Sequence, residues 1–96
     1  MSKICITPVR KNKAIRRLKA IEGQVKGLQK MLEEDRYCVD ILTQISSTHE
    51  ALRSVGKLIM QNYLEVCATN AIRSKHKEKQ DAIYNELMDI IYKYVK

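Results

Sequence analysis

The sequence has no tryptophan or phenylalanine, and only one proline and three glycines in 96 residues. So few glycines and prolines leave little material for hairpin turns or for a glycine-rich phosphate loop. Purely apolar runs such as Leu58–Met60 are too short to span a membrane, and the N-terminus lacks the apolar stretch of a secretory signal. Three widely spaced cysteines argue against a disulfide framework and favour a reducing, cytoplasmic compartment.

Positive charge is concentrated in the first third of the chain. The formal net charge is +7, and residues 1–36 hold ten basic and four acidic side chains. Residues 37–96 hold eight basic and seven acidic side chains and are nearly balanced. This asymmetry suggests a polyanionic partner, with nucleic acid first and an anionic membrane second, whereas a solvated basic helix face is the simpler alternative.

Apolar residues recur in steps of four and three along two long segments, the period of an amphipathic helix. The pattern predicts a single all-α domain over 1–96 with two long helices and one short one. Thr7 is the expected N-cap of the first helix, and Asp35 that of the second. A second helix of this length suggests a bundle whose core is shared with another chain. The expected segments are a tail over 1–8 and helices over 9–34, 36–70 and 79–95.

The two long helices each carry an expected core seam. Gly23 and Gly27 lie on one face of the first helix, where close approach of another backbone, or of DNA, explains their presence. The seam of the first helix comprises Ala14, Leu18, Ile21, Val25, Leu28 and Leu32, and that of the second comprises Cys38, Leu42, Ile45, His49, Leu52, Gly56, Ile59, Tyr63 and Val66.

Cys38 and Cys67 are 29 residues apart, which is about eight helical turns, so both side chains are expected on one face of the second helix. An unbroken helix would hold them about 43 Å apart. They can therefore meet only between antiparallel helices of two chains, as in a twofold dimer. Cys38 lies in the first turn, where the helix N-terminus favours a thiolate that could act as a nucleophile or a soft-metal ligand. Tyr37 adjoins Cys38, and Tyr63 lies one turn before Cys67.

No catalytic constellation is legible, so the chain is not expected to be an enzyme, and no cofactor is expected. Cys5 in the tail is interpreted as incidental. His49 and His76 are not at metal-ligand spacing from a cysteine, and a satisfied or solvated role is favoured for both.

A basic stripe runs along the first helix. Arg10, Lys13 and Arg17 repeat at helical spacing, as expected of a surface that binds phosphates without reading bases. No helix-turn-helix pattern is present. Lys11 belongs to the same basic cluster, and Arg53 and Lys57 form a second basic pair on the second helix. The residues expected to contact DNA are Arg10, Lys13, Arg16, Arg17, Lys19 and Arg53.

Three runs of sequence together resemble the copper-sensitive operon repressor (CsoR) family. They are Arg-Leu-Lys-Ala-Ile-Glu-Gly-Gln-Val-Lys-Gly over 17–27, Met-Leu-Glu-Glu-Asp-Arg-Tyr-Cys-Val-Asp over 31–40, and Gln-Ile-Ser over 44–46. The resemblance implies antiparallel four-helix-bundle dimers that pair into tetramers. It also implies that the uninduced protein binds operator DNA through basic residues on both long helices, and that an inducer at an inter-subunit cysteine site releases the DNA.

The resemblance assigns Cys38 and Cys67 as the sensing thiols and Arg17 as a DNA-binding residue. Tyr37 and Glu86 match positions that couple the copper site to DNA affinity in copper-sensing members. Tyr63 departs from the pattern, because copper-sensing members have histidine there as the third Cu(I) ligand, and tyrosine is a poor ligand for a soft metal.

Two cysteines without that histidine resemble the persulfide-sensing branch, the CsoR-like sulfurtransferase repressors. The favoured expectation is therefore a repressor in which a Cys38 persulfide forms a di-, tri- or tetrasulfide bridge to Cys67 of the other subunit, with no metal. The alternative is a Cu(I)-responsive repressor that uses Cys38 and Cys67, with Cys5 as a possible third ligand. A basic architectural protein with inert cysteines is a more remote interpretation.

Overall fold

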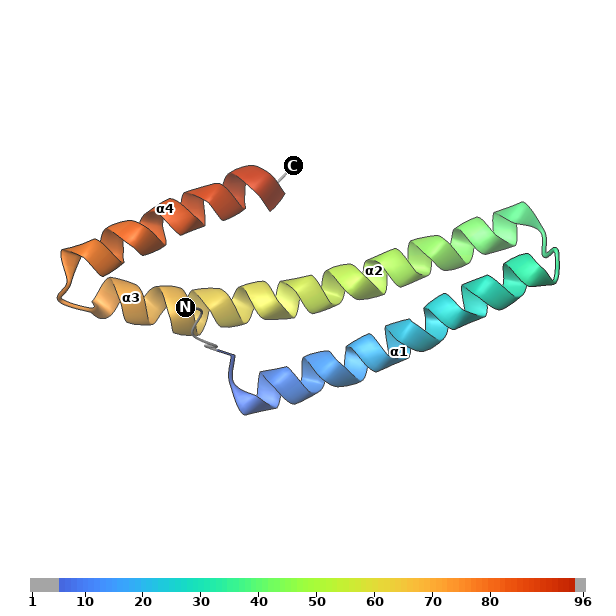
Figure 1. The fold of residues 1–96 in the computed structure, drawn as a ribbon, viewed down its shortest axis with the longest axis horizontal. Coiled ribbons are helices and arrows are strands. Elements are labelled where there is room, and N and C mark those ends of the chain that lie inside the picture. Colours follow the sequence, from blue (N-terminus) through green and yellow to red (C-terminus); the bar gives the residue numbers. More distant parts are fainter. Residues whose placement is uncertain (1–5, 95–96) are drawn as a thin grey trace.

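The computed structural model describes residues 6–94, all of whose regular elements are helical, as the sequence predicted. The elements are α1 (Pro8–Glu33), α2 (Cys38–Asn62), the π-helical segment η1 (Tyr63–Ala68), α3 (Thr69–Arg73) and α4 (Lys77–Tyr94). Figure 1 shows α1 and α2 as an antiparallel hairpin, with α4 folded back along the opposite side of the α2–α3 rod. The molecule is elongated, with principal extents of 59 × 29 × 20 Å.

Local capping explains where α1 begins and ends. The Thr7 side chain accepts a hydrogen bond from the Arg10 backbone N–H, and Pro8 occupies the first turn, as predicted. At the other end, Asp35 has φ 54°, and the N–H groups of Asp35 and Arg36 bond the carbonyls of Leu32 and Met31. This is a Schellman motif with aspartate in the left-handed position. The prediction that Asp35 is the N-cap of the second helix was therefore wrong; Tyr37 holds that position.

The rod from Cys38 to Arg73 is one continuous helix, because the residues at both junctions, Asn62–Tyr63 and Ala68–Thr69, have right-handed helical dihedrals. It starts two residues later and ends three later than the predicted 36–70, and α4 starts two earlier than the predicted 79. The π-helical segment was not predicted. Its wide turn leaves the Leu64 carbonyl to accept from the Thr69 hydroxyl, at 2.8 Å.

Two different faces of α2 carry apolar residues. Ala14 and Ile21 of α1 pack on Val55 of α2, with Ala51 and Leu58 against them. This face is not the predicted seam of the second helix, whose apolar members are largely exposed. Within one chain the first predicted seam is therefore buried only in part, at Ala14 and Ile21, and the second stays a prediction for a core shared with another chain.

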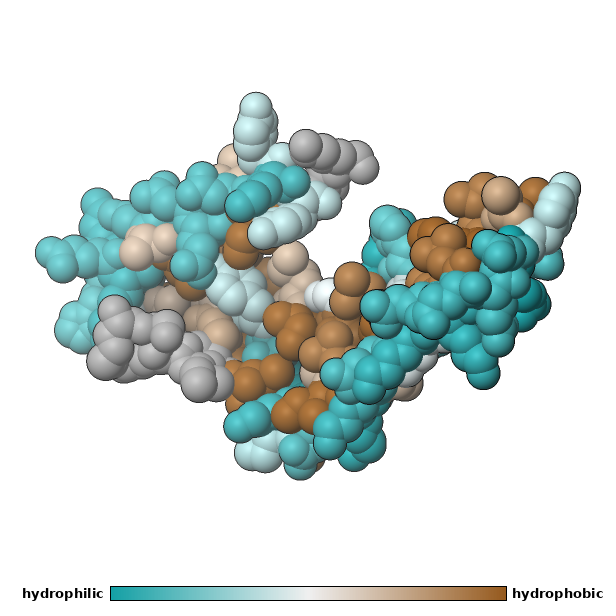
Figure 2. Space-filling model, turned by 45° about the vertical axis from the view of Figure 1, so that its right-hand side comes forward, coloured by the Kyte–Doolittle hydropathy of each residue, from teal (hydrophilic) through white to brown (hydrophobic). Residues whose placement is uncertain are grey.

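The exposed apolar residues form rows beside this small core. On α1 the rows include Leu18, Val25 and Leu32, and on α2 they include Leu42, Ile45, Leu52 and Ile59. Figure 2 shows brown apolar side chains open to solvent between two groups of hydrophilic ones. Within 6–94, no other part of the chain approaches Gly23 or Gly27, since an added Cβ would meet no atom beyond the surrounding helix within 4 Å. No helix of the described chain is long and apolar enough to cross a membrane.

Candidate functional site

Cys38 is the first residue of α2 and is exposed. Tyr37 precedes it as N-cap, makes no capping hydrogen bond through its side chain and is 70% exposed. Cys38 therefore lies at a helix N-terminus, as predicted, and in the single chain it is exposed although it was placed on the core seam. Although Tyr37 adjoins Cys38 in the sequence, within one chain its side chain projects largely into solvent.

Cys67 lies in the π-helical segment and is half-buried. The prediction of one common face for the two thiols assumed 3.6 residues per turn throughout. A π turn contains more residues, so η1 rotates Cys67 away from the position that an uninterrupted α-helix would give it. Such segments are rare and occur frequently at functional sites.

The two thiols cannot meet within one chain. The continuous rod between them keeps them about 40 Å apart at the usual helical rise. Nor do residues 6–94 of one chain bring together three or more histidine, cysteine or acidic side chains that could hold a metal ion. Any site that uses both thiols needs two copies of the chain. Cys5, the suggested extra ligand, lies outside the described residues.

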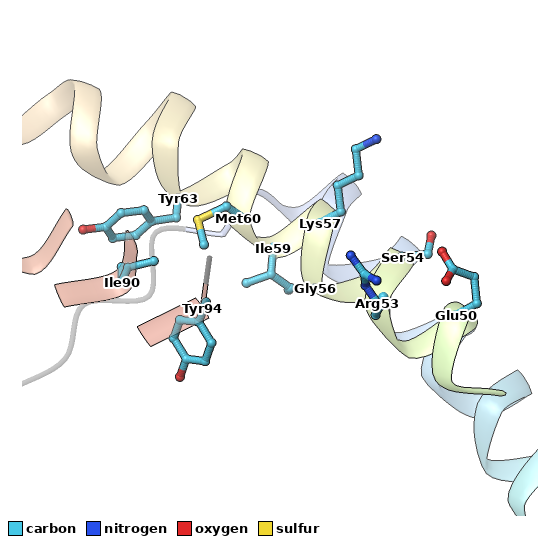
Figure 3. Close-up of a pocket in the computed structure, with 10 residues that line it drawn as sticks. All are labelled: Glu50, Arg53, Ser54, Gly56, Lys57, Ile59, Met60, Tyr63, Ile90 and Tyr94. Carbon is cyan, nitrogen blue, oxygen red and sulfur yellow. The ribbon is translucent and has the colours of Figure 1, made fainter. Parts of the chain in front are cut away.

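Tyr63 links η1 to α4. Its phenol donates a hydrogen bond of 2.5 Å to Glu86 Oε1. The structure thus brings together Tyr63 and Glu86, two positions that the sequence analysis associated with the thiol site. A groove of about 1020 Å³ lies beside them, between α2 and α4. In Figure 3, Tyr63, Met60 and Ile90 gather at one end of this groove, whereas Arg53 and Lys57 lie toward the other.

Arg10 was predicted to contact DNA, but in the structure its guanidinium binds the protein itself. It forms an ion pair with Glu65 of η1 and donates to Asn62 Oδ1 at 3.4 Å. The hydrogen bond from Arg10, with a second from Gln61, holds the pKa of Glu65 below its usual value. Asn62, only 3% exposed, also accepts from the Thr7 backbone N–H at 3.2 Å. The N-terminus of α1 is thus bound to the segment that carries Cys67.

The other predicted DNA-binding residues lie on the surface. The Arg17 guanidinium donates to the Ser54 hydroxyl at 3.1 Å, which orients it across the α1–α2 hairpin. The exposed cations that remain available for phosphates are Lys11, Lys13, Arg16, Lys19, Arg53 and Lys57.

Sequence reasoning missed Glu65 and Asn62. Gln61 and Glu65 are one helical turn apart, which is an ordinary surface spacing. Nothing in the sequence links either Asn62 or Glu65 to Arg10, more than fifty residues away.

Comparisons with known proteins agree on one family. A family model described as metal-sensitive transcriptional repressor matches residues 10–93. The copper-sensing transcriptional repressor CsoR of Bacillus subtilis is 42% identical over 86 residues, covering 90% of this chain and 82% of that protein. The copper-sensing repressor RicR of Mycobacterium tuberculosis is 47% identical over 62 residues, 65% of each chain. The crystal structure of CsoR with Cu(I) from Geobacillus thermodenitrificans superposes with a TM-score of 0.85 at 41% identity, covering 99% of this chain and 96% of that one.

Proposed function

The chain belongs to the metal-sensitive transcriptional repressor family, and from that premise we propose that it represses transcription in response to Cu(I). Members of this family are transcriptional repressors and not enzymes, in agreement with the sequence. The observation that supports Cu(I) as the inducer is that a relative similar over 90% of this chain, CsoR of Bacillus subtilis, is copper-sensing. Cu(I) was the alternative in the sequence analysis, and the relatives favour it over the persulfide.

The donor chemistry fits Cu(I) with two ligands. Thiolates are soft donors that select Cu(I), and Cys38 and Cys67 lie within the family match. Tyr63 supplies no soft donor, and its phenol is directed at Glu86. We therefore assign the ligands as Cys38 of one copy and Cys67 of a second copy.

A dimer that supplies both thiols is supported by the exposed apolar rows. Leu18 and Val25 on α1 and Leu52 and Ile59 on α2 are each 43–53% exposed in the single chain. An antiparallel second copy would cover these rows and place its Cys67 near Cys38. The proposed assembly is a four-helix-bundle dimer that pairs into a tetramer.

The proposed DNA surface is the basic side of α1 together with Arg53. Lys13, Arg16 and Lys19 are exposed, and Arg17 is oriented by Ser54. These cations would bind operator phosphates, which gives affinity that falls with salt. A repressor of this kind would act in the cytoplasm, where thiols stay reduced.

A persulfide-responsive repressor is the second candidate, and Tyr63 favours it because the third copper ligand is replaced. Cys38 thiolate would attack a sulfane-sulfur donor and take one sulfur atom as the donor leaves as its thiolate. Cys67 thiolate of the other copy would then attack the inner sulfur, form a disulfide and release hydrosulfide.

One experiment separates the two candidates. Reduced protein is treated with one equivalent of Cu(I) or with a persulfide donor, followed by non-reducing intact-protein mass spectrometry and DNA-binding anisotropy. Copper retention with DNA release and no covalent dimer would support Cu(I). A covalent dimer with DNA release only after the persulfide donor would overturn it in favour of the second candidate.

Tyr63→His sharpens the same distinction. Because imidazole suits copper better than phenol, this variant is expected to bind Cu(I) at least about tenfold more tightly than the parent chain. Competition with a chromogenic Cu(I) chelator measures this. Unchanged affinity would mean that residue 63 does not face the two thiols.

A further inference from the structure

We propose that Arg10 and Glu65 form a latch between the DNA-binding helix α1 and the π-helical segment that carries Cys67. Through this latch, DNA binding on α1 alters the exposure of Cys67. The inference rests on the proposed function in one respect, since it takes α1 as a DNA-binding element. It does not depend on which inducer reacts with the thiols.

The latch is a small network. Arg10 pairs with Glu65 and also donates to Asn62 Oδ1 at 3.4 Å. Gln61 Nε2 donates to the other Glu65 oxygen at 3.1 Å, so both carboxylate oxygens are bound. Asn62 accepts in addition from the Thr7 N–H that precedes the helix. The first turn of α1 is thus attached to residues 61–65 at several points.

These contacts bear on Cys67 because of the geometry of η1. Glu65 lies two residues before Cys67 within the same six-residue π-helical segment. A π turn is less favourable than an α turn and needs contacts to hold it. A change of this segment toward α-helix would rotate Glu65 and Cys67 together. The first turn of α1 would then either move with Glu65, or the ion pair between Arg10 and Glu65 would break.

The latch is also connected to the proposed DNA-binding residues of α1. Arg10 lies on the same helix as Arg16 and Arg17, and an α-helix moves as a rigid element over this length. Displacement at Arg10 therefore changes how these cations face DNA phosphates. Coupling of this kind is reciprocal. If DNA binding changes the affinity of Cys67 for a ligand, that ligand changes the affinity for DNA by the same factor.

A surface salt bridge without such a role is the competing explanation. Ion pairs at exposed sites contribute little to stability, and the Arg10 and Glu65 side chains are 23% and 51% exposed. A purely structural pair would alter unfolding slightly and would leave the communication between DNA and Cys67 intact.

The test measures how fast iodoacetamide alkylates Cys67 in the reduced full chain, by peptide mass spectrometry, with and without DNA. The DNA is a duplex selected from random sequence by the reduced protein. The variants are Glu65→Gln, the swap Arg10→Glu/Glu65→Arg, and Glu33→Gln. The last removes the same charge at the far end of α1.

DNA is expected to slow alkylation of Cys67 about fivefold or more in the parent chain and in Glu33→Gln. In Glu65→Gln the effect is expected to fall below about twofold, because the charge-assisted pairing is lost. The swap is expected to restore it.

An undiminished DNA effect in Glu65→Gln would overturn the latch and indicate direct shielding by DNA. No DNA effect in the parent chain would overturn it as well. Failure of Cu(I) to release DNA, with the alkylation pattern as expected, would overturn the proposed inducer and leave the latch standing.

Discussion

Cys38 and Cys67 lie on one continuous helix, but their surroundings differ. Cys38 begins a regular α-helix and faces solvent beside an exposed tyrosine. Cys67 is half-buried in a π turn that is bound from α1 through Glu65 and from α4 through Tyr63. The Cys38 end is thus open to small molecules in the single chain, whereas the Cys67 end is attached to two other helices, through which the proposed latch would act.

The largest expected effect comes from removing the exposed thiol. Cys38→Ala is expected to keep DNA binding but to lose inducer-dependent release, a decrease of more than about tenfold in the induced change of affinity. Because Cys38 is exposed, its truncation is expected to leave the fold intact, so the control is an unchanged helical circular-dichroism spectrum. DNA release by inducer from Cys38→Ala would assign sensing elsewhere.

The next largest effect is expected from removing a cation from the proposed DNA surface on α1. Arg17→Ala is expected to weaken DNA binding on every sequence and to reduce the slope of log affinity against log salt by about 0.9, the value of one phosphate contact. Ser54→Ala is the matched control, because it removes the hydrogen bond that orients Arg17 but keeps the charge. Equal salt slopes for Arg17→Ala and the parent chain would exclude Arg17 from the phosphate contacts.

Side-chain hydrogen bonds near Cys67 are expected to contribute more to the free energy of unfolding than those near Cys38. Asn62→Ala is expected to lower the free energy of unfolding by about 2 kcal/mol, since it leaves the Thr7 N–H unsatisfied beside a buried position. Thr43→Ala, near Cys38, removes only an exposed hydroxyl bond to the Val39 carbonyl and should cost under about 0.5 kcal/mol. Urea unfolding of both variants measures the difference; equal costs would remove the distinction.

Among the contacts that hold the Cys67 end of the rod, the one from α4 is expected to contribute least to stability. Tyr63→Phe loses the hydrogen bond to Glu86 but keeps the ring, and should cost about 1 kcal/mol of stability. Glu86→Gln keeps an acceptor and should cost less. Thermal unfolding compares them, and a Tyr63→Phe variant as stable as the parent would mean that this bond does not hold α4.

The sequence predicted the regular parts well. The four-and-three spacing located all the long helices, and Thr7 with Pro8 located the start of α1. These features are local, so residue pattern and capping chemistry suffice to predict them.

The parts that failed depend on geometry that residue spacing does not encode. The π turn over Tyr63–Ala68 leaves the apolar pattern unbroken, and Asp35 was misassigned because a left-handed C-terminal position and an N-cap both accept aspartate. The Arg10–Glu65 pair joins residues 55 positions apart and exists only once the hairpin has closed.

The central claim is that one sensing site takes Cys38 from one chain and Cys67 from another. Subunit mixing tests it most directly: Cys38→Ala and Cys67→Ala chains are unfolded together, refolded and titrated with Cu(I). Each variant alone is expected to bind no tight Cu(I). Mixed dimers, about half of those formed at random, are expected to regain one tight site each. Absence of any tight site in the mixture, while the parent chain refolded in the same way binds Cu(I) tightly, would contradict the account.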